Sequence, residues 1–240
     1  MKIKIATWNM AHWSHRNLNK DSWKYLSQDI DADILLFQEA YPNYSVIKED
    51  CTVWNEIGGS RPWGSGIYSE KFKIKEHAFK NSLFGAVVAS EVEIKPDFNL
   101  IVISLYAMLE RLFGQVWSIP NLHRVFSDLT EILENPSFKH RVVIAGDFNA
   151  SLQFDKTSGN NSHRVFFDRL KEFGLHNCFD DYFDGFVQTH RHSKSDKPWQ
   201  DDYFFISNKL KKSLVNCEVL DNEKVRKFSD HNPVIIELVI

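Results

Sequence analysis

The segment RVVIAGDFN, residues 141–149, decides the fold class of this chain. Residues 142–145 form an unbroken apolar run rich in β-branched side chains, which favours a strand that is buried on both faces. The polarity then changes abruptly, since Asp147 and Asn149 follow within four residues. A buried strand that ends in acidic and amide groups can present them from a rigid scaffold to a cleft. The segment therefore predicts a buried sheet with chemistry at one edge.

Further apolar runs of strand length recur along the chain. Many are rich in Val, Ile and Phe, which favour strands, and the runs occupy residues 3–7, 34–38, 66–69, 86–94, 100–106, 141–145, 203–207 and 233–239. Residues 34–37 are apolar on both faces, whereas residues 2–5 alternate between charged and apolar side chains. The chain is therefore expected to contain both central and half-exposed strands.

Helical patterns are fewer than strands and lie between them. They cover residues 20–30, 119–134 and 163–173, with Asn19, Ser118 and Ser162 as expected N-caps and Gly174 as an expected stop. Two stacked sheets with helices on the outside would satisfy this mixture of elements. We therefore predict an α/β fold of that arrangement.

The length and composition of the chain support one substantial core. Of 240 residues, 43% are hydrophobic, and no repeat, low-complexity segment or Pro/Gly/Ser-rich linker interrupts them. We expect a single domain over residues 1–240. The three cysteines, Cys51, Cys178 and Cys217, are widely spaced and outside any CxxC pattern, which fits reduced thiols better than a disulfide framework or a zinc site.

The N-terminal pattern and the net charge are informative about location and partners. Residues 1–5 alternate charge and apolar bulk, unlike a signal peptide, and no run approaches membrane-spanning length. We therefore expect a cytoplasmic protein with no membrane span. The formal net charge of −3 gives no global basic field of the kind that marks many nucleic-acid binders. Charge leaves the substrate open, and the sequence indicates no protein partner.

Four more polar clusters lie at the ends of predicted strands. Two of them, at Asn9 and Glu39, follow strands, and two, at Asp202 and at Asp230-His231, precede strands. Taken alone, each cluster is more commonly structural, as an Asx turn, a solvated strand end or a surface turn. Together with residues 146–149 they form five clusters that could converge on one cleft.

Hydrolysis of a phosphate ester matches this set of side chains. The reaction needs a hard cation to neutralise developing charge, and the oxygens of Glu39, Asp230 and Asn9 are of the type that Mg²⁺ accepts. It also needs a group that positions and deprotonates the attacking water, and donors for the nonbridging oxygens. The candidates for these roles are Asp147, Asn149 and His231.

In their order along the chain and in their combination, the five clusters resemble the signatures of the endonuclease/exonuclease/phosphatase superfamily. The superfamily comprises metal-dependent phosphohydrolases similar to exonuclease III and deoxyribonuclease I, and the resemblance spans residues 3–239. It implies a four-layer sandwich of two stacked mixed sheets flanked by helices. It also implies an enzyme that hydrolyses phosphate esters with Mg²⁺, for which Mn²⁺ could substitute.

The resemblance implies a role for each residue of the metal and water sites. Glu39 matches the principal metal-ligand glutamate, Asn9 the asparagine beside it, and Asp230 the acidic residue near the metal. Asp147 matches the aspartate that orients or activates the attacking water, and Asn149 its phosphate-contacting neighbour.

The resemblance also assigns the histidine and two of its companions. His231 matches the catalytic histidine and Asp202 the carboxylate that holds it, which leaves the adjacent Asp201 as a spare acidic residue. Tyr106 stands where the abasic-site endonuclease branch has a phosphate-contacting tyrosine. However, Ala11 replaces an acidic residue of that branch, and residues 108–110 lack its asparagine-bearing loop. Dedicated abasic-site repair is therefore not expected.

Two other features are given structural interpretations. His190 and His192 would share one face of a strand, but no third zinc ligand with suitable spacing is evident, so we interpret them as surface or substrate-rim histidines. The glycine-rich residues 58–66 lack a P-loop lysine and are expected to form a turn before a strand, with Arg61 or Trp63 at the cleft edge.

Three functions remain open at this level. Cleavage of nucleic-acid phosphodiester bonds is favoured, hydrolysis of a small-molecule or lipid-headgroup phosphoester is the alternative, and a catalytically silent binding module of the same fold is the third. A basic rim for a polyanion is conceivable, although such residues more commonly form a solvated face. The residues concerned are Lys209, Lys211, Lys212, Arg111, Arg191 and Lys194.

Overall fold

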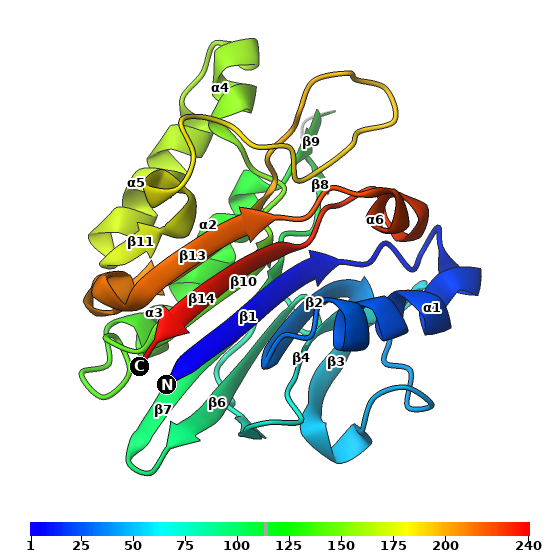
Figure 1. Cartoon of the computed structure of the whole chain (residues 1–240). Helices are drawn as coiled ribbons and strands as arrows, with labels where there is room; N and C mark the ends of the chain where they lie inside the picture. The colour runs from blue at the N-terminus through cyan, green and yellow to red at the C-terminus, as the bar shows by residue number, and fades with distance from the viewer. Residues whose placement is uncertain (113–114) are drawn as a thin grey trace.

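Two stacked sheets form the centre of the molecule, with helices on both outer faces (Figure 1). The structure is a computed structural model that describes residues 1–112 and 115–240, without the side chains of residues 110–117. Each large sheet has six strands and mixes parallel with antiparallel pairs. The predicted arrangement of two mixed sheets flanked by helices is therefore confirmed.

The first sheet is built from both ends of the chain. In it, β1 lies between β14 on its antiparallel side and β2 on its parallel side. The strand order is β13 (Leu214–Val219), β14 (Val234–Val239), β1 (Lys2–Asn9), β2 (Ile34–Ala40), β4 (Arg61–Tyr68) and β3 (Thr52–Gly58).

The second sheet comes from the middle of the chain. Its centre is β10, which runs parallel to β7 and antiparallel to β12. The strand order is β11 (Leu175–Asn177), β12 (Asp202–Ser207), β10 (Val142–Asp147), β7 (Phe98–Tyr106), β6 (Val87–Lys95) and β5 (Lys73–Glu76). A separate two-stranded ribbon pairs β8 (Glu110–Leu112) with β9 (Gln115–Trp117).

Side-chain alternation along the central strands explains why they are apolar on both faces. In β10, Val143 and Ala145 pack between the two sheets, whereas Val142 and Ile144 pack against the helices on the other face. Successive side chains of a strand point to opposite faces, so a strand with apolar layers on both sides must be apolar throughout. The interface between the sheets is one core, and each helical layer adds another.

Helices cover the two outer faces. Packed on the first sheet are α1 (Asn19–Lys24), the π-helical turn η2 (Tyr25–Asp29) and α6 (Glu223–Phe228). On the second sheet lie α2 (Ile119–Asp128), α3 (Thr130–Leu133) and α5 (Ser162–Glu172). The other helical segments are α4 (Leu152–Ser158) and the short 3-10 turns η1 (Arg16–Leu18), η3 (Glu49–Cys51), η4 (Cys178–Asp181) and η5 (Asn208–Ser213).

The predicted helix ends are only partly correct. Asn19 and Ser162 are the first residues of their helices instead of N-caps, and Ser118 takes the N-cap position but donates its hydroxyl to the Asn149 carbonyl oxygen. The predicted helix over residues 119–134 divides at Leu129 into α2 and α3. Gly174 does end α5, in the left-handed conformation at φ +72°.

All three cysteines are unpaired, in agreement with the sequence prediction. Cys178 and Cys217 are buried in the core between the sheets. Within residues 1–112 and 115–240, the helices are too short or too polar to cross a bilayer.

A buried histidine after β1 makes stability depend on pH. His12 is 1% exposed, and its Nε2 and Nδ1 lie 3.0 Å from Ser22 Oγ and 3.1 Å from Asn19 Nδ2. Burial, with a smaller effect of His15, lowers the pKa of His12 from 6.5 to about 3. Between these pH values the unfolded chain binds a proton that the folded chain does not, so stability falls as the pH falls.

We expect this histidine to remove about 2 kcal/mol of folding free energy between pH 7 and pH 5. Urea unfolding of the wild type and of His12→Gln at both pH values measures the contribution, because glutamine keeps hydrogen-bonding groups but does not titrate. The variant should lose clearly less stability over this interval. Identical losses in the two proteins would show that His12 is not responsible.

Candidate active site

Polar residues from both sheets meet at one edge of the sandwich. In the second sheet, Asp147 on β10 lies directly opposite Tyr106 on β7 and Asp202 on β12. The first sheet contributes Asn9 at the end of β1 and Glu39 near the end of β2. Parallel strands end at the same edge of a sheet, and their antiparallel neighbours begin at that edge. All of these side chains therefore lie at one end of the sandwich.

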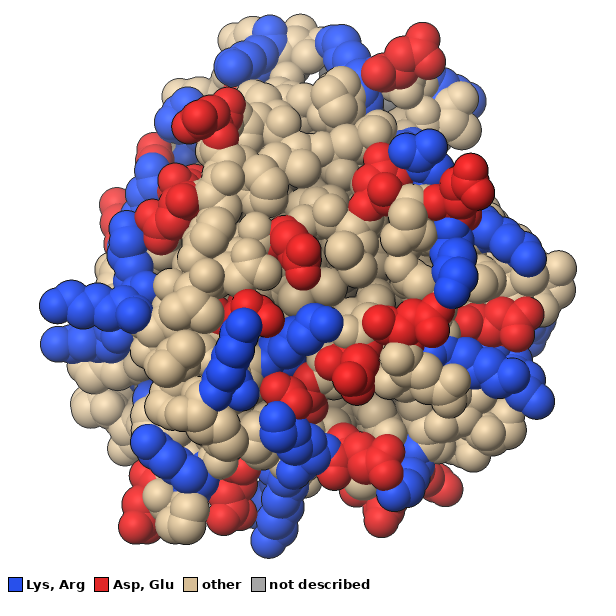
Figure 2. Space-filling view, viewed as in Figure 1, with Lys and Arg blue, Asp and Glu red and all other residues tan. Residues whose placement is uncertain are grey.

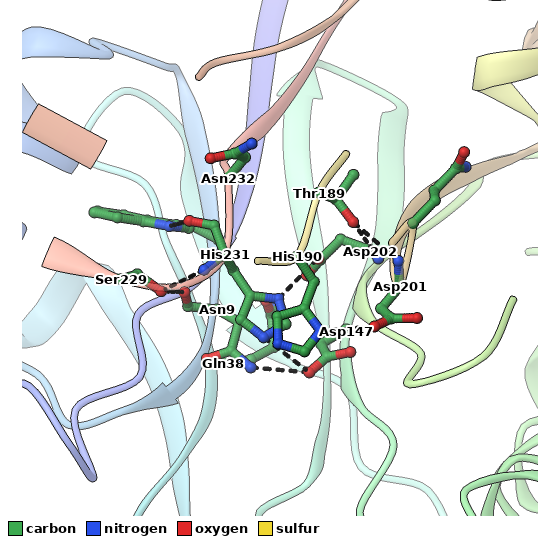
Figure 3. A network of polar contacts seen from close by, with 12 residues as sticks. Asn9, Gln38, Asp147, Thr189, His190, Asp201, Asp202, Ser229, His231 and Asn232 are labelled. Carbon is green, nitrogen blue, oxygen red and sulfur yellow. Dashed lines mark hydrogen bonds and ion pairs between the residues drawn. The ribbon is translucent and has the colours of Figure 1, made fainter. Parts of the chain in front are cut away.

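Asn9 joins the two sheets. Its Nδ2 donates to Asp147 Oδ2 at 2.9 Å and to Glu39 Oε1 at 3.3 Å, while its Oδ1 accepts from the backbone N–H of Ala11 at 3.0 Å. The Ala11 contact fixes which side of the amide faces the carboxylates. Asn9 is therefore a donor that holds two acidic groups side by side, and Figure 3 shows its contact with Asp147.

Glu39 occupies a rare backbone conformation. Its φ is +47°, in the left-handed region that L residues seldom adopt, and its carbonyl oxygen accepts from His12 N–H at 2.9 Å. Asn149 shares this conformation, with φ +46°. Such backbone strain persists only where the surroundings impose it, and it clusters at functional sites.

The backbone conformation at residue 146 explains why a glycine precedes Asp147 in the strand-end motif. Gly146 has φ +142°, and a Cβ added there would lie 2.0 Å from the Leu105 carbonyl oxygen. Only glycine lets β10 approach β7 this closely at the strand end. The glycine thus allows Asp147 to enter the site in register with Tyr106.

Asp147 is, with Asp202, one of two almost fully enclosed acids of the site. It is 1% exposed, and its Oδ1 accepts from Asn149 N–H at 2.8 Å while its Oδ2 accepts from Asn149 Nδ2 at 3.1 Å. Burial raises the pKa of the Asp147 carboxyl well above its usual range, the charge of His231 opposes that rise, and the Asp202 carboxylate adds to it. The site therefore contains an acid with unusual affinity for a proton.

His231 faces Asp147 from the other side. Its Nδ1 lies 2.8 Å from Asp202 Oδ2 and its Nε2 lies 3.9 Å from Asp147 Oδ2. Burial alone would lower the pKa of His231, but the charges of Asp202 and Asp147 outweigh burial and raise it well above 6.5. The ring is anchored through its backbone, which accepts from Trp8 Nε1 at 2.9 Å.

Glu39, Tyr106 and Asp230 complete the predicted set. Burial raises the pKa of Glu39, and a hydrogen bond from Tyr106 and the charge of His231 oppose that rise. Burial and the neighbouring acids raise the pKa of Tyr106 in turn, so it remains a phenol that can donate. Asp230 is half-buried, and its charge acts on both Glu39 and His231. The structure thus brings all eight predicted residues to one edge.

A second histidine–aspartate pair lies beside the first and was not predicted. His190 Nδ1 lies 2.8 Å from Asp201 Oδ2, and the His190 ring stacks on His231 with centroids 4.3 Å apart and planes 6° apart (Figure 3). Asp201 is not a spare residue, because it is 3% exposed and binds this ring. The sequence offered one local signal for this pair, the adjacent acids Asp201 and Asp202. The pairing itself depends on tertiary contacts, because His190 forms β-bridges with Trp199 and His231.

The zinc alternative for His190 and His192 gains no support. Within the described part of the chain, the one set of three side chains that could share a metal is Asp147, Asp202 and His231, with ligand atoms within 4.8 Å of one another. His192 instead uses its Nδ1 to accept from the Lys194 backbone N–H.

The turn in the glycine-rich segment is shorter than predicted, because only Gly59 and Ser60 lie between β3 and β4, and residues 61–66 already belong to β4. Gly58 and Gly59 have positive φ at this turn, and Arg61 acts electrostatically on Tyr106. Trp63 lies in β4, with its indole N–H buried and without a hydrogen-bond partner among the described residues.

The basic residues do not form one rim. Lys209, Lys211 and Lys212 lie on η5, which follows the end of β12 remote from Asp202, and Lys211 pairs with Asp181. Arg191 lies near the site, where it donates to Asn232 and to the Ser229 carbonyl oxygen. The side chain of Arg111 lies outside the described residues. On the face shown in Figure 2, Lys and Arg are interspersed with Asp and Glu.

Comparisons with known proteins agree with this geometry. The family model described as Endonuclease/Exonuclease/phosphatase family matches residues 6–231, and no curated protein matches the chain. Similar solved structures include AP endonuclease LMAP from Leishmania major, at 18% identity and a TM-score of 0.74, covering 100% of this chain and 88% of that chain. The 3′-5′ exonuclease NExo from Neisseria meningitidis has 18% identity and a TM-score of 0.74, covering 99% and 100%.

A third similar structure is an AP endonuclease from Archaeoglobus fulgidus, at 17% identity and a TM-score of 0.75, covering 99% of this chain and 100% of that chain. At such identities the likeness shows the fold, whereas the family match spans most of the sequence and includes all the predicted site residues. The chain therefore belongs to the Endonuclease/Exonuclease/phosphatase family and is an enzyme of its phosphoester-hydrolysing type.

Proposed function

We propose that this enzyme cleaves phosphodiester bonds of nucleic acids with the help of a bound Mg²⁺, for which Mn²⁺ can substitute. The observation that carries the proposal is the opposition of Asp147 and His231, a buried acid and a buried imidazole whose Oδ2 and Nε2 lie 3.9 Å apart at the meeting point of the two sheets, with the pKa of the imidazole raised by the charges of Asp202 and Asp147. For a phosphate bound beside this pair, the acid can deprotonate the attacking water and the imidazole can stabilise the charge that develops on the phosphate.

The residues present fit a hard divalent cation. Glu39, Asp147 and Asp202 are all at least nine-tenths buried, and Asp202 Oδ1 has no hydrogen-bond partner among the described residues. Buried carboxylates that repel one another indicate a missing positive charge, and oxygen donors are what Mg²⁺ selects.

Two positions for the cation compete. The ligand atoms of Asp147, Asp202 and His231 lie closest together, but Asp202 already binds the imidazole, whose positive charge would repel a cation. We therefore favour Glu39 and Asp230 as the ligands. Asn9 belongs to the same position, although here its amide N–H₂ faces the acids, so an oxygen contact would require the amide to turn. When bound, the cation neutralises charge on the phosphate.

The remaining catalytic roles belong to side chains of the protein. Asp147 orients the attacking water and takes its proton, which its raised proton affinity favours. His231 donates from Nε2 to a nonbridging oxygen of the phosphate, while Asp202 holds its Nδ1. Tyr106 and Asn149 supply further donors, because both lie within hydrogen-bonding contact of the acids.

Nucleic acid is the favoured substrate because the similar structures include AP endonucleases and a 3′-5′ exonuclease. Small-molecule or lipid-headgroup phosphoesters are the alternative, and a silent binding module is the third possibility. A panel of DNA, RNA, abasic duplex, cyclic nucleotides and lipid headgroups with Mg²⁺ or Mn²⁺ separates them. Failure on every substrate would favour the binding module. We also propose a cytoplasmic location, for which the unpaired cysteines are the support.

Glu39 provides the direct test of the metal. We expect Mg²⁺ binding in calorimetric titration to weaken at least about tenfold in Glu39→Ala, since a ligand contributes no less than the outer contacts that change affinity by roughly 10–100-fold. Hydrolysis of bis(p-nitrophenyl) phosphate should stop in EDTA and in the variant. The matched control is Glu70→Ala, because Glu70 is an exposed glutamate that pairs with Lys48. Unchanged binding in Glu39→Ala would remove Glu39 from the metal site.

A further inference from the structure

Arg191 spans the turn that carries Asp230 and His231, which we call the His231 turn (residues 229–232). The arginine is half-buried, and two nitrogens of its guanidinium donate to this turn. Nη2 donates to the Ser229 carbonyl oxygen at 2.6 Å, and Nη1 donates to Asn232 Oδ1. These two acceptors flank Asp230 and His231 in the sequence, so one planar group holds both ends of the turn.

The acceptor on Asn232 has a fixed orientation. The side chain is fully buried, and its Nδ2 donates to the Gln188 carbonyl oxygen at 2.8 Å, which leaves Oδ1 for the arginine. A guanidinium presents several N–H groups in a rigid fork, whereas a lysine ammonium is a single charged point on a flexible stem. The contact with two separate oxygens therefore requires arginine and not merely a positive charge.

The segment that bears this arginine also holds the partner of His231. The hydroxyl of Thr189 accepts from the backbone N–H groups of Asp201 and Asp202 at 2.9 and 3.0 Å (Figure 3). The carbonyl oxygen of Thr189 accepts from the backbone N–H of Asn232 at 2.6 Å. One stretch of backbone is thus bonded to the start of β12 and to the His231 turn, so it helps to set the separation of Asp202 and His231.

The other contacts of the turn do not depend on arginine. The Ser229 hydroxyl donates to the Asn9 carbonyl oxygen at 2.7 Å and accepts from His231 N–H at 3.0 Å, which fixes the side of the turn that faces β1. The backbone N–H of Arg191 donates to the Asp230 carbonyl oxygen at 2.8 Å. Any residue except proline could make that backbone bond. The guanidinium is therefore the part of this segment that a substitution can remove cleanly.

A nearby acid leaves the guanidinium to the turn. Arg191 Nη1 lies 3.6 Å from Asp221 Oδ1, whereas Arg226 donates to the two oxygens of Asp221 at 2.7 and 3.0 Å. A bidentate pair of this kind is the stronger interaction. Asp221 is thus neutralised by Arg226, and Arg191 keeps its short contacts with the turn.

We propose that Arg191 is a positioning residue, a clamp that holds Asp230 and His231 in working geometry on one turn. This inference rests on the proposed function, which places Asp230 at the metal and His231 at the phosphate. Because one turn carries both groups, its loosening should weaken metal binding and turnover together. A residue that acted on the imidazole alone would change turnover alone.

The test measures Mg²⁺ binding by calorimetric titration and hydrolysis of bis(p-nitrophenyl) phosphate in Arg191→Ala. We expect metal affinity to fall about tenfold, as for other contacts that orient metal ligands. We expect kcat to fall roughly tenfold to a hundredfold, since a misplacement of about 1 Å can cost that much. KM should change less than kcat, because the guanidinium binds the turn and not the phosphate. Arg191→Met, which keeps the apolar stem, should show the same losses.

Added guanidinium separates positioning from a general loss of stability. At millimolar concentration it should restore both kcat and Mg²⁺ affinity to Arg191→Ala, whereas ammonium should not, and Arg191→Lys should likewise recover little. The matched control is Arg169→Ala, because Arg169 joins α5 to α2 by donating to the His123 carbonyl oxygen at 3.0 Å and to Ser127 Oγ at 3.1 Å. This control should lose stability but keep wild-type kcat and metal affinity.

Several results would overturn the clamp and leave the phosphodiesterase function intact. A lower melting temperature in Arg191→Ala with wild-type kcat and metal affinity would show that the arginine only stabilises the fold. A higher KM with unchanged metal binding would make it a substrate contact. Full activity in Arg191→Lys, or no recovery with guanidinium, would refute the contact with two oxygens. A wild-type protein that neither binds Mg²⁺ nor cleaves bis(p-nitrophenyl) phosphate would refute the proposed function and the clamp together.

Discussion

Replacement of Asp147 with asparagine is expected to lower phosphodiester hydrolysis by about a thousandfold, the middle to upper range for loss of a positioned acid–base group. Asparagine has nearly the same shape, so the substrate cleft should survive. It cannot take a proton from water, however, and its N–H₂ would point at a position where Asn9 and Asn149 already donate. The measurement is kcat on bis(p-nitrophenyl) phosphate at saturating Mg²⁺.

Stability should respond differently from activity in this variant. Because burial and the Asp202 carboxylate raise the pKa of Asp147, its ionised form is unfavourable in the folded protein at neutral pH. A neutral residue relieves that cost, which offsets the donor conflict, so we expect a melting temperature equal to or above that of the wild type. Activity within tenfold of wild type would show that Asp147 does not deprotonate the attacking water.

The second large effect is expected at Asp202. The Asp202→Asn variant should lose turnover by roughly a hundredfold or more, because the imidazole loses the charge that fixes its orientation and favours its protonated form. With the largest raising influence removed, burial should lower the pKa of His231, and less of it would be charged at neutral pH. Magnesium affinity should stay nearly unchanged, since Glu39 and Asp230 remain.

A double-variant cycle tests whether the two residues act as a unit. His231→Ala combined with Asp202→Asn should be little worse than His231→Ala alone, since residues that work together are not additive. Asp181→Asn is the matched control, as its histidine partner His176 lies at the other end of β12. If the effects of the two substitutions on turnover were fully additive, or if Asp202→Asn had normal turnover, Asp202 and His231 would not act as a pair.

The sequence predicted the interior of the sheets better than their borders. All eight predicted strands are present, and they are mainly the central ones, such as β10, whose apolar layers on both faces leave a continuous signal. The strands that were missed at the borders are β3, β5, β11 and β13, which occupy the four edges. An edge strand such as β5, KIKE, exposes most of its side chains, so neither length nor hydrophobicity distinguishes it from a loop.

The two unpredicted helices, α4 and α6, are short and mostly polar. Their ends are nevertheless capped, because Ser151 and Asn222 accept from backbone N–H groups of the first turn. A cap alone is too common a feature to reveal a helix without an apolar stripe behind it.

The site itself was predictable where its residues stand at strand ends. Asp147 and Asp202 face each other because β10 and β12 pair there, and a strand-end motif carries that information locally. The His190–Asp201 pair was not predictable, since it depends on how the loop after β11 folds back against Trp199 and His231. The spacing of 11 residues between the two partners has no regular secondary structure to fix it.

The division of the site between two sheets has a kinetic consequence. Asn9 and Asp147 are 138 residues apart, and Trp8 and His231 are 223 apart, yet both pairs are hydrogen-bonded. Neither sheet alone contains the set of groups that the reaction needs, because Asn9, Glu39 and His231 come with the first sheet and Asp147 and Asp202 with the second. During folding, such non-local contacts form late and slowly. A partly folded chain with one assembled sheet therefore lacks part of the site, and it is expected to stay inactive until the second sheet has assembled.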